Sequence, residues 1–154
     1  MSQTKPNYVR IAPGEELPDT SNHAPFKAVV VVEGEYEPEW QREVSRWLVD
    51  SGCLYLMAWG SDCQNWHDAV DRVNIDEFAP GDIPDDKFIM TTWHEKESLE
   101  NVFWFAQFCA EFSYNQTKLS RTLIVHISAQ DRKSEMLDLF ERSKTLAERE
   151  EDES

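Results

Sequence analysis

Two histidines and one cysteine lie where side chains could do chemistry. Cys63 precedes His67 by four residues, and His94 follows a short apolar run. Histidine can act as a general acid or base, and a cysteine near a cationic group or a helix N-terminus can act as a nucleophile. His67, His94 and Cys63 are therefore the candidate catalytic residues, although the neighbouring Asp62 and Asp68 oppose formation of a thiolate.

The same segments contain residue types that bind zinc and related ions. His67, His94 and Asp62 are the candidate metal ligands, but no HxxxH or CxxC spacing accompanies them. The other histidines, His23 and His126, are interpreted as structural. We expect no cofactor, and the sequence leans against an enzyme without excluding one, because it shows no complete set of nucleophile, base and orienting group.

Alternating strand and helix patterns must position these residues. Four apolar runs predict strands, and each is followed by a helical pattern, the first of which places apolar residues on one face from Trp40 to Leu48. The order predicts an α/β fold: a three-layer α/β/α domain, Rossmann-like or flavodoxin-like, with a four-stranded mainly parallel sheet. The predicted strands are Phe26–Val32, Leu54–Trp59, Phe88–Thr92 and Thr122–Ile127.

The chain divides into three predicted parts. Residues 1–25 are rich in proline and polar residues and predict an extended N-terminal arm. Residues 26–147 predict a single α/β domain, and the acidic residues 148–154 predict a disordered tail. No secretory signal or bilayer-spanning run is visible, and the three cysteines show no paired spacing. These features predict a cytoplasmic protein with reduced thiols.

Parallel strands bring the turns that follow them to one edge of the sheet, where ligands bind in such folds. Histidines, tryptophans and acids collect in these turns. Aromatic rings interleaved with acids favour a cationic or amphipathic partner, through burial and cation–π contact. The predicted binding surface consists of Glu33, Glu35, Trp59, Asp62, Trp66, Asp68, Trp93, His94 and Glu95.

The negative charge of the chain is concentrated in the first three of these turns and in the second and third crossovers between strands. The 30 acidic and 15 basic residues give a net charge of −15. Residues 33–39 hold four acids and no base, and residues 62–100 hold eleven acids and three bases. This charge argues against direct binding to a nucleic-acid backbone and against docking on an anionic membrane.

These features favour a non-catalytic acidic interaction or inhibitor module that covers the basic surface of a protein partner. Candidate partners are a nuclease toxin, which its immunity protein inhibits, and a nucleic-acid-binding protein of a bacterial defence system. A charge that only keeps the protein soluble is a further explanation. The alternative function is a small-molecule- or metal-dependent site, as in a hydrolase, that uses His67, His94, Asp62 and Glu95.

The predicted helix 97–112 is apolar on more than one side. Such a helix is either buried deep in its own domain or covered by a partner. The second explanation predicts a homodimer through this helix. The candidate oligomer interface consists of Trp104, Phe105, Phe108 and Phe112.

Two motifs resemble those of a family of small uncharacterised bacterial proteins. They are Trp59-Gly60-Ser61-Asp62-Cys63 (WGxDC) and the run from Asp85 to Glu95 (DDKFxMTTWHE). The resemblance also takes in the strand Leu123–Ser128 and covers residues 26–142. It implies a bacterial, cytosolic, single-domain protein, and it assigns no activity and no catalytic residue.

Overall fold

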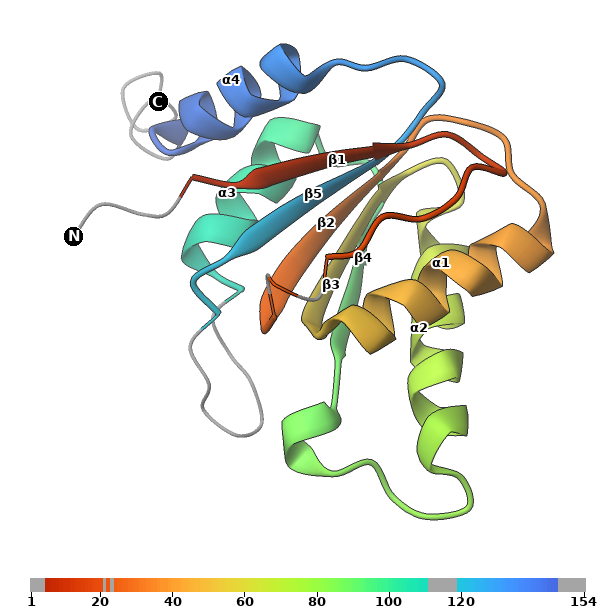
Figure 1. Ribbon diagram of the computed structural model, residues 1–154. Helices are drawn as coiled ribbons and strands as arrows, with labels where there is room; N and C mark the ends of the chain where they lie inside the picture. Colours follow the sequence, from red (N-terminus) through yellow and green to blue (C-terminus); the bar gives the residue numbers. More distant parts are fainter. Residues whose placement is uncertain (1–4, 21, 23, 111–118, 147–154) are drawn as a thin grey trace.

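The computed structural model describes residues 5–20, 22, 24–110 and 119–146. Strands and helices alternate along most of this chain (Figure 1). The strands are β1 (Asn7–Ile11), β2 (Phe26–Val32), β3 (Cys53–Gly60), β4 (Met90–His94) and β5 (Thr122–Ile127). The helices are α1 (Pro38–Ser51), α2 (Cys63–Phe78), α3 (Leu99–Phe108) and α4 (Lys133–Ser143), with a short 3₁₀ helix at Asp85–Lys87.

The strands form one parallel sheet in the order β1-β5-β2-β3-β4. The predicted α/β class and the parallel arrangement are confirmed, and the layout is consistent with a Rossmann-like domain. The predicted number of strands is wrong, because the sheet has five strands rather than four.

The additional strand, β1, lies within the segment that the sequence predicts to be an extended arm. Tyr8 pairs with Ile124 and Ile11 pairs with Ile127, so β1 extends the sheet beside β5. The strand is short and lies between two proline-containing segments, and its apolar alternation is too brief to mark it in the sequence. Its structure therefore depends on pairing with a strand near the other end of the chain.

Helices cover both faces of the sheet, as the three-layer prediction requires. Figure 1 shows α1 and α2 on one face and α3 and α4 on the other. Residues alternate along each strand between these two cores. Val30 and Leu56 face α1 and α2, whereas Val29 and Met57 face α3 and α4.

Local sequence signals set the ends of α1. Pro38 occupies the first turn, where a missing backbone N–H costs no hydrogen bond. Gly52 ends the helix with φ at 101°, and its N–H bonds to the carbonyls of Leu48 and Val49. The segment after β1 then packs over this helix, because Trp47 Nε1 donates to the Pro18 carbonyl at 2.6 Å.

The strand order reverses between β2 and β5. From β2 the chain proceeds through β3 to β4 at one edge, with α1 and α2 on the same face. It then crosses to the other face through α3 and returns to β5, on the far side of β2. In open parallel sheets ligands bind at such a reversal, beyond the carboxyl ends of the strands.

Candidate functional site

A crevice of about 800 Å³ opens beside this reversal, at the carboxyl ends of β2 and β3. Its walls are the loops that enter α1 and α2 and the loop that follows β1. Its volume is in the range of ordinary ligand pockets. It is lined by Pro13, Gly14, Glu33, Gly34, Glu35, Tyr36, Glu37, Pro38, Trp40, Gln41, Ser61, Asp62 and Asn65.

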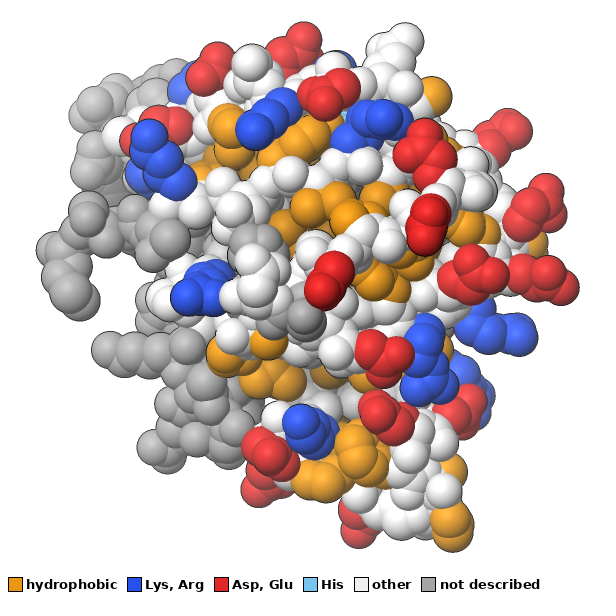
Figure 2. Space-filling model, viewed as in Figure 1, with side chains coloured by type: hydrophobic (Ala, Val, Ile, Leu, Met, Phe, Trp, Pro, Cys, Tyr) orange, Lys and Arg blue, Asp and Glu red, His pale blue; other side chains and the backbone are white. Residues whose placement is uncertain are grey.

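The crevice is strongly acidic. Glu33, Glu35, Glu37 and Asp62 contribute carboxylates, and the lining residues include no lysine or arginine. Acidic side chains crowd the same side of the molecule, over the loop between β2 and α1 (Figure 2). The structure thus brings together three residues of the predicted binding surface, Glu33, Glu35 and Asp62. A cleft lined by one sign of charge concentrates the opposite charge, here cations.

Asp62 holds an unusual backbone conformation at the edge of the crevice. Its φ of 55° and ψ of 33° lie in the left-handed region, which costs free energy for a residue other than glycine. Asp62 precedes α2, but its side chain makes no capping hydrogen bond. Instead, its carboxylate accepts a long hydrogen bond of 3.4 Å from the Tyr36 hydroxyl. The strained turn therefore presents this carboxylate to the crevice rather than to the helix.

Gly60 brings the end of β3 against the end of β2. Its φ is 104°, and a Cβ atom placed on it would lie 2.3 Å from the Val32 carbonyl oxygen. The next residue, Ser61, donates its backbone N–H to the same oxygen at 3.0 Å. This close approach sets the distance between the two loops that form the crevice walls.

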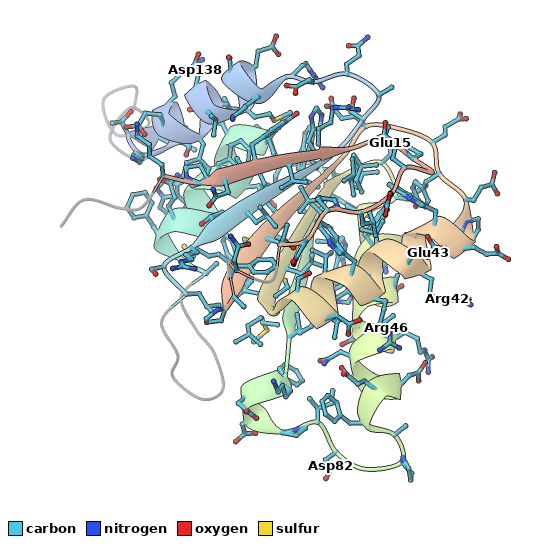
Figure 3. All side chains as sticks on the ribbon, viewed as in Figure 1. Glu15, Arg42, Glu43, Arg46, Asp82 and Asp138 are labelled. Atoms are coloured by element: carbon cyan, nitrogen blue, oxygen red, sulfur yellow. The ribbon has the colours of Figure 1, made fainter. Side chains whose placement is uncertain are left out.

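The basic residues of α1 are placed apart from the crevice. Figure 3 shows Arg42, Glu43 and Arg46 along the outer side of the helix, away from the sheet. Glu15, which follows β1, is not part of the lining and forms an ion pair with Arg10 at 3.9 Å. The charge of the crevice is therefore not neutralised by the helix that borders it.

A buried hydrogen-bond network reaches the crevice at Glu33. The side chain of His126 in β5 is fully buried, and it bonds to the Tyr8 hydroxyl through Nδ1, at 2.6 Å, and to Glu33 Oε1 through Nε2. The Arg132 guanidinium binds the same carboxylate oxygen, and the Arg132 backbone N–H donates to Tyr8 Oη at 3.2 Å. The network joins β1, β5, the loop after β2 and the start of α4.

Burial controls the protonation of this network. Burial lowers the pKa of His126; the charge of Asp131 acts in the opposite direction, and Arg10 lowers the pKa further. Burial also raises the pKa of Tyr8, against the effect of the Arg132 backbone N–H. A neutral His126 ring then satisfies every contact, because Nε2–H donates to Glu33 and Nδ1 accepts from the Tyr8 hydroxyl.

His94, at the end of β4, belongs to a second network. Its Nδ1 lies 2.6 Å from Glu97 Oε2, and its Nε2 lies 3.0 Å from Thr92 Oγ1. Glu97 also accepts from Asn101 Nδ2 at 2.8 Å and, through its backbone carbonyl, from Trp59 Nε1 at 2.7 Å. These bonds hold the turn between β4 and α3.

The hydrogen bonds of His94 leave neither ring nitrogen free. The Thr92 hydroxyl donates to the Leu56 carbonyl at 3.2 Å, so its oxygen can accept from Nε2–H. The Glu97 carboxylate can only accept, so Nδ1–H donates to it. Both ring nitrogens are thus engaged by neighbouring side chains of the domain. This arrangement argues against His94 as a metal ligand or a general base.

The sheet separates His67 from His94. Trp93 and His94 are consecutive in β4, so their side chains point to opposite faces. His67 packs edge-on against Trp93, with ring centroids 4.6 Å apart, whereas His94 packs against Phe105 of α3 at 5.1 Å. Within the described part of the chain, no three His, Cys, Asp or Glu side chains form a group that could hold a metal. The predicted ligands His67, His94 and Asp62 are therefore not brought together in one metal site.

Cys63 begins α2 with a buried thiol. The residue is 3% exposed. Burial raises the pKa of the thiol, Glu95 raises it further, and the backbone N–H of His94 acts in the opposite direction. The neutral thiol is a poor nucleophile. This environment argues against Cys63 as a catalytic residue.

We expect a single cysteine of the native protein to react rapidly with Ellman's reagent. Cys109 is exposed, whereas Cys53 and Cys63 are buried, and burial raises the pKa of Cys53 to about 12. In denaturant all three thiols become reactive. The released chromophore measures the number of reactive thiols in the native and in the denatured protein. Cys109→Ser is the control that removes the fast phase. Rapid reaction of a second thiol in the native protein would contradict the burial of the other two.

The predicted aromatic surface is only partly exposed. Trp93 is 42% exposed and Trp59 is half-buried, but Trp66 is fully buried and cannot form part of a binding surface. The Trp66 ring packs edge-on against Tyr36 and Trp40 instead, at 5.1 and 6.5 Å. Helix α2 turns this residue toward the sheet, so its prediction as a surface residue is wrong. The Trp66 ring supports two crevice residues from beneath.

Helix α3 buries most of its apolar side chains within its own domain. Val102 and Phe103 lie in the core beneath it. Of the candidate oligomer interface, Trp104 and Phe105 are half-buried and Phe108 is 44% exposed. Phe112 lies outside the described residues. Burial within its own domain therefore accounts for much of the apolar composition of this helix, and a homodimer stays a prediction.

A family model matches residues 6–143, from just before β1 to the end of α4. The chain belongs to the family DUF7684, a domain of unknown function. Because the match begins before β1, the DUF7684 domain includes the edge strand within the predicted arm. A search of curated proteins and a search of solved structures found no match. None of the described helices is long and apolar enough to cross a membrane.

Three residues of the buried network in this DUF7684 domain are absent from the predicted site. Tyr8 lies in the segment predicted to be an arm, and His126 was interpreted as structural because it lies inside an apolar strand. For His126 the sequence does contain a signal, because a titratable residue near the carboxyl end of a buried strand is a candidate site residue. Arg132 gave no signal, because its approach to Glu33 depends on the order of β2 and β5 in the sheet.

Proposed function

We propose that this domain is a non-catalytic acidic binding module that covers a basic surface of a protein partner. We place it among immunity- or defence-associated modules of the bacterial cytoplasm. The observation that carries the proposal is the crevice, where Glu35, Glu37 and Asp62 present carboxylates and no described lysine or arginine is part of the lining; the fourth carboxylate, of Glu33, is already paired with Arg132. A lysine or arginine side chain of the partner enters this crevice, where a guanidinium can bond to two carboxylates at once.

The groups around the crevice support binding rather than catalysis. Within the described part of the chain, no histidine or cysteine lines it. Cys63 is buried nearby as a thiol, and His67 and His94 lie on opposite sides of the sheet. Carboxylates without a nucleophile or a proton-transfer partner attract a cation but complete no catalytic set.

The charge distribution supports rapid association with a basic partner. The net charge of −15 gives the whole chain a negative field, and the carboxylates of the crevice add to this field at the proposed contact. Steering of this kind speeds association and weakens as salt screens the charges. The proposed complex is therefore salt-sensitive in its association rate.

The test is affinity purification from the native host, followed by binding measurements with the recovered partner. We expect the wild type to retain a basic protein. The triple variant Glu35→Gln/Glu37→Gln/Asp62→Asn should bind it at least about tenfold more weakly, since several charge contacts are lost. All three side chains belong to exposed residues, so the fold should persist, and the melting temperature checks this.

A matched control removes the same charge elsewhere. Glu43, Asp76 and Asp138 are exposed and lie outside the crevice lining, so Glu43→Gln/Asp76→Asn/Asp138→Asn should keep most of the affinity. Equal loss in both triple variants would mean that net charge, not the crevice, attracts the partner. A partner that is not basic would contradict the proposal itself.

A second candidate function is binding of a small cationic molecule in the same crevice. It is favoured by the volume of about 800 Å³ and by the network that ends at Glu33 on its wall. Of the residues predicted for a small-molecule site, only Asp62 lines the crevice. Spermidine should raise the melting temperature of the wild type and not of the crevice triple variant if this function holds.

A further inference from the structure

The two edges of the sheet differ in how they are protected against pairing. Edge strands present unpaired backbone N–H and C=O groups, and proteins usually block them with charged residues or proline. At one edge, β1 carries Arg10 and lies between Pro6 and Pro13. At the other edge, β4 reads Met-Thr-Thr-Trp-His and contains no proline, lysine, arginine or acid. Among the described residues, β4 pairs only with β3.

Trp93 presents an aromatic surface at this unprotected edge. It is 42% exposed although it is the largest side chain of the strand. His67 of α2 packs edge-on against it, with centroids 4.6 Å apart, and supports the ring on the α2 side. The ring therefore keeps a defined position while much of it faces solvent, which suits stacking with a flat or cationic group.

Carboxylates flank the same edge. Asp68 bonds to His67 Nδ1 at 2.9 Å, and its side chain is 63% exposed. Glu95, which follows the strand directly, is also exposed. An acidic residue thus follows Trp93 two positions along the chain, and a second one is bonded to the histidine that packs against its ring.

We infer that β4 is a docking edge for an extended, basic segment of a protein partner, which pairs with it as an additional strand. Backbone hydrogen bonds to the free edge supply affinity, and alternate side chains of the segment reach Trp93 and the flanking acids. An arginine of the segment stacks on Trp93 and bonds to Asp68 or Glu95. The inference rests on the proposed function, since it takes the partner to be basic, and it adds a second contact surface beyond the crevice.

Charge decides between a basic segment and a second copy of this chain. Two copies paired through β4 would bring equal charges of −15 together and would face the flanking acids of one copy with those of the other. A basic segment meets the same acids with opposite charge. The edge is therefore complementary to a basic strand and not to itself.

The experiment uses the full chain and a blocked peptide of about seven residues, the length of an ordinary strand, that alternates arginine with valine. Amide hydrogen exchange should slow at β4 when the peptide binds. Trp93→Lys should weaken binding at least about tenfold, because it removes the stacking surface and adds a like charge. Phe108→Lys is the matched control, since Phe108 is 44% exposed on α3 at the other face of the sheet. It should bind as the wild type does.

A second measurement does not depend on a substitution in the protein. Methylating the backbone nitrogens along one edge of the peptide removes strand-pairing hydrogen bonds but keeps every positive charge. The methylated peptide should bind the wild type at least about tenfold more weakly, since β-pairing derives its affinity from main-chain bonds. Equal binding of the two peptides would overturn the inference.

The remaining outcomes separate this inference from the proposed function. If the crevice triple variant loses the peptide while Trp93→Lys keeps it, the crevice alone recognises basic segments, and the edge inference fails while the proposed function stands. If no basic peptide binds the wild type, the edge inference fails, and affinity purification decides the proposed function separately. A dimer in sedimentation that Trp93→Lys dissociates would show that a second copy occupies the edge, and would also overturn the inference.

Discussion

Replacing His126 with leucine is expected to lower the free energy of unfolding by about 3 kcal/mol, the loss typical of a broken buried hydrogen-bond network. Leucine has a similar volume but bonds to neither Tyr8 nor Glu33, whose contacts with His126 join β1 and β2 to β5. Arg132 still bonds to both partners, so the network is weakened and not abolished. Denaturant unfolding monitored by tryptophan fluorescence measures the change.

His67→Leu is the control for the loss of a histidine. Its ring bonds to Asp68, whose side chain is 63% exposed, and such surface contacts contribute at most about 1 kcal/mol. We therefore expect a much smaller effect at His67 than at His126. Equal losses at the two positions would contradict the structural role of the buried network.

The same variant should change how stability depends on pH. Burial lowers the pKa of His126 in the folded chain, so between that value and about 6.5 the unfolded chain binds more protons. Stability contributed by the neutral ring is thus present above about pH 6.5 and declines as the pH falls through this window. His126→Leu removes the titrating group, so its stability should fall less steeply over the same range.

The core of the fold could be predicted because its strands are buried on both faces. Such strands are continuous apolar runs, as in Phe26–Val32 and Thr122–Ile127, and their positions match the structure. The ends of α1 are set by Pro38 and Gly52, whose backbone preferences act locally. In each case the signal lies within the element itself.

β1 and the buried network could not be predicted in the same way. β1 has few residues, and its pairing with β5 depends on a segment far away in the chain. The meeting of Glu33, His126 and Arg132 depends on the order of β2 and β5, which no local pattern encodes. Sequence patterns report local periodicity, whereas strand order results from packing of the whole sheet.

Which of the predicted site residues lie together could be inferred at the edge of the sheet but not across its two faces. Glu33, Glu35 and Asp62 follow parallel strands and meet at the carboxyl edge, as expected. The same argument groups His67 with His94, but His94 is the last residue of β4 and therefore has a defined face. The alternation of side chains along a strand separates it from the α2 side, where His67 lies.

Gly60→Ala is expected to destabilise the domain by about 3 kcal/mol or more, because it combines backbone strain with a steric clash. The new Cβ would lie 2.3 Å from the Val32 carbonyl oxygen, a backbone atom that cannot move without displacing β2. Either the φ of 104° or the contact between Ser61 and Val32 must then change. Thermal or denaturant unfolding measures the loss.

Gly14→Ala separates the effect of backbone strain from the effect of the steric clash. Gly14 also has a positive φ, 89°, but no atom of the described residues lies within 4 Å of a Cβ placed on it. It should therefore lose only the conformational part, about 1 kcal/mol. The difference between the two variants measures the steric clash at the junction of β2 and β3. If the two losses are equal, the end of β3 can move away from β2, and the spacing of the crevice walls does not depend on this contact. If Gly60→Ala is the costlier change and also weakens binding of the basic partner, the same close approach that stabilises the sheet shapes the acidic crevice.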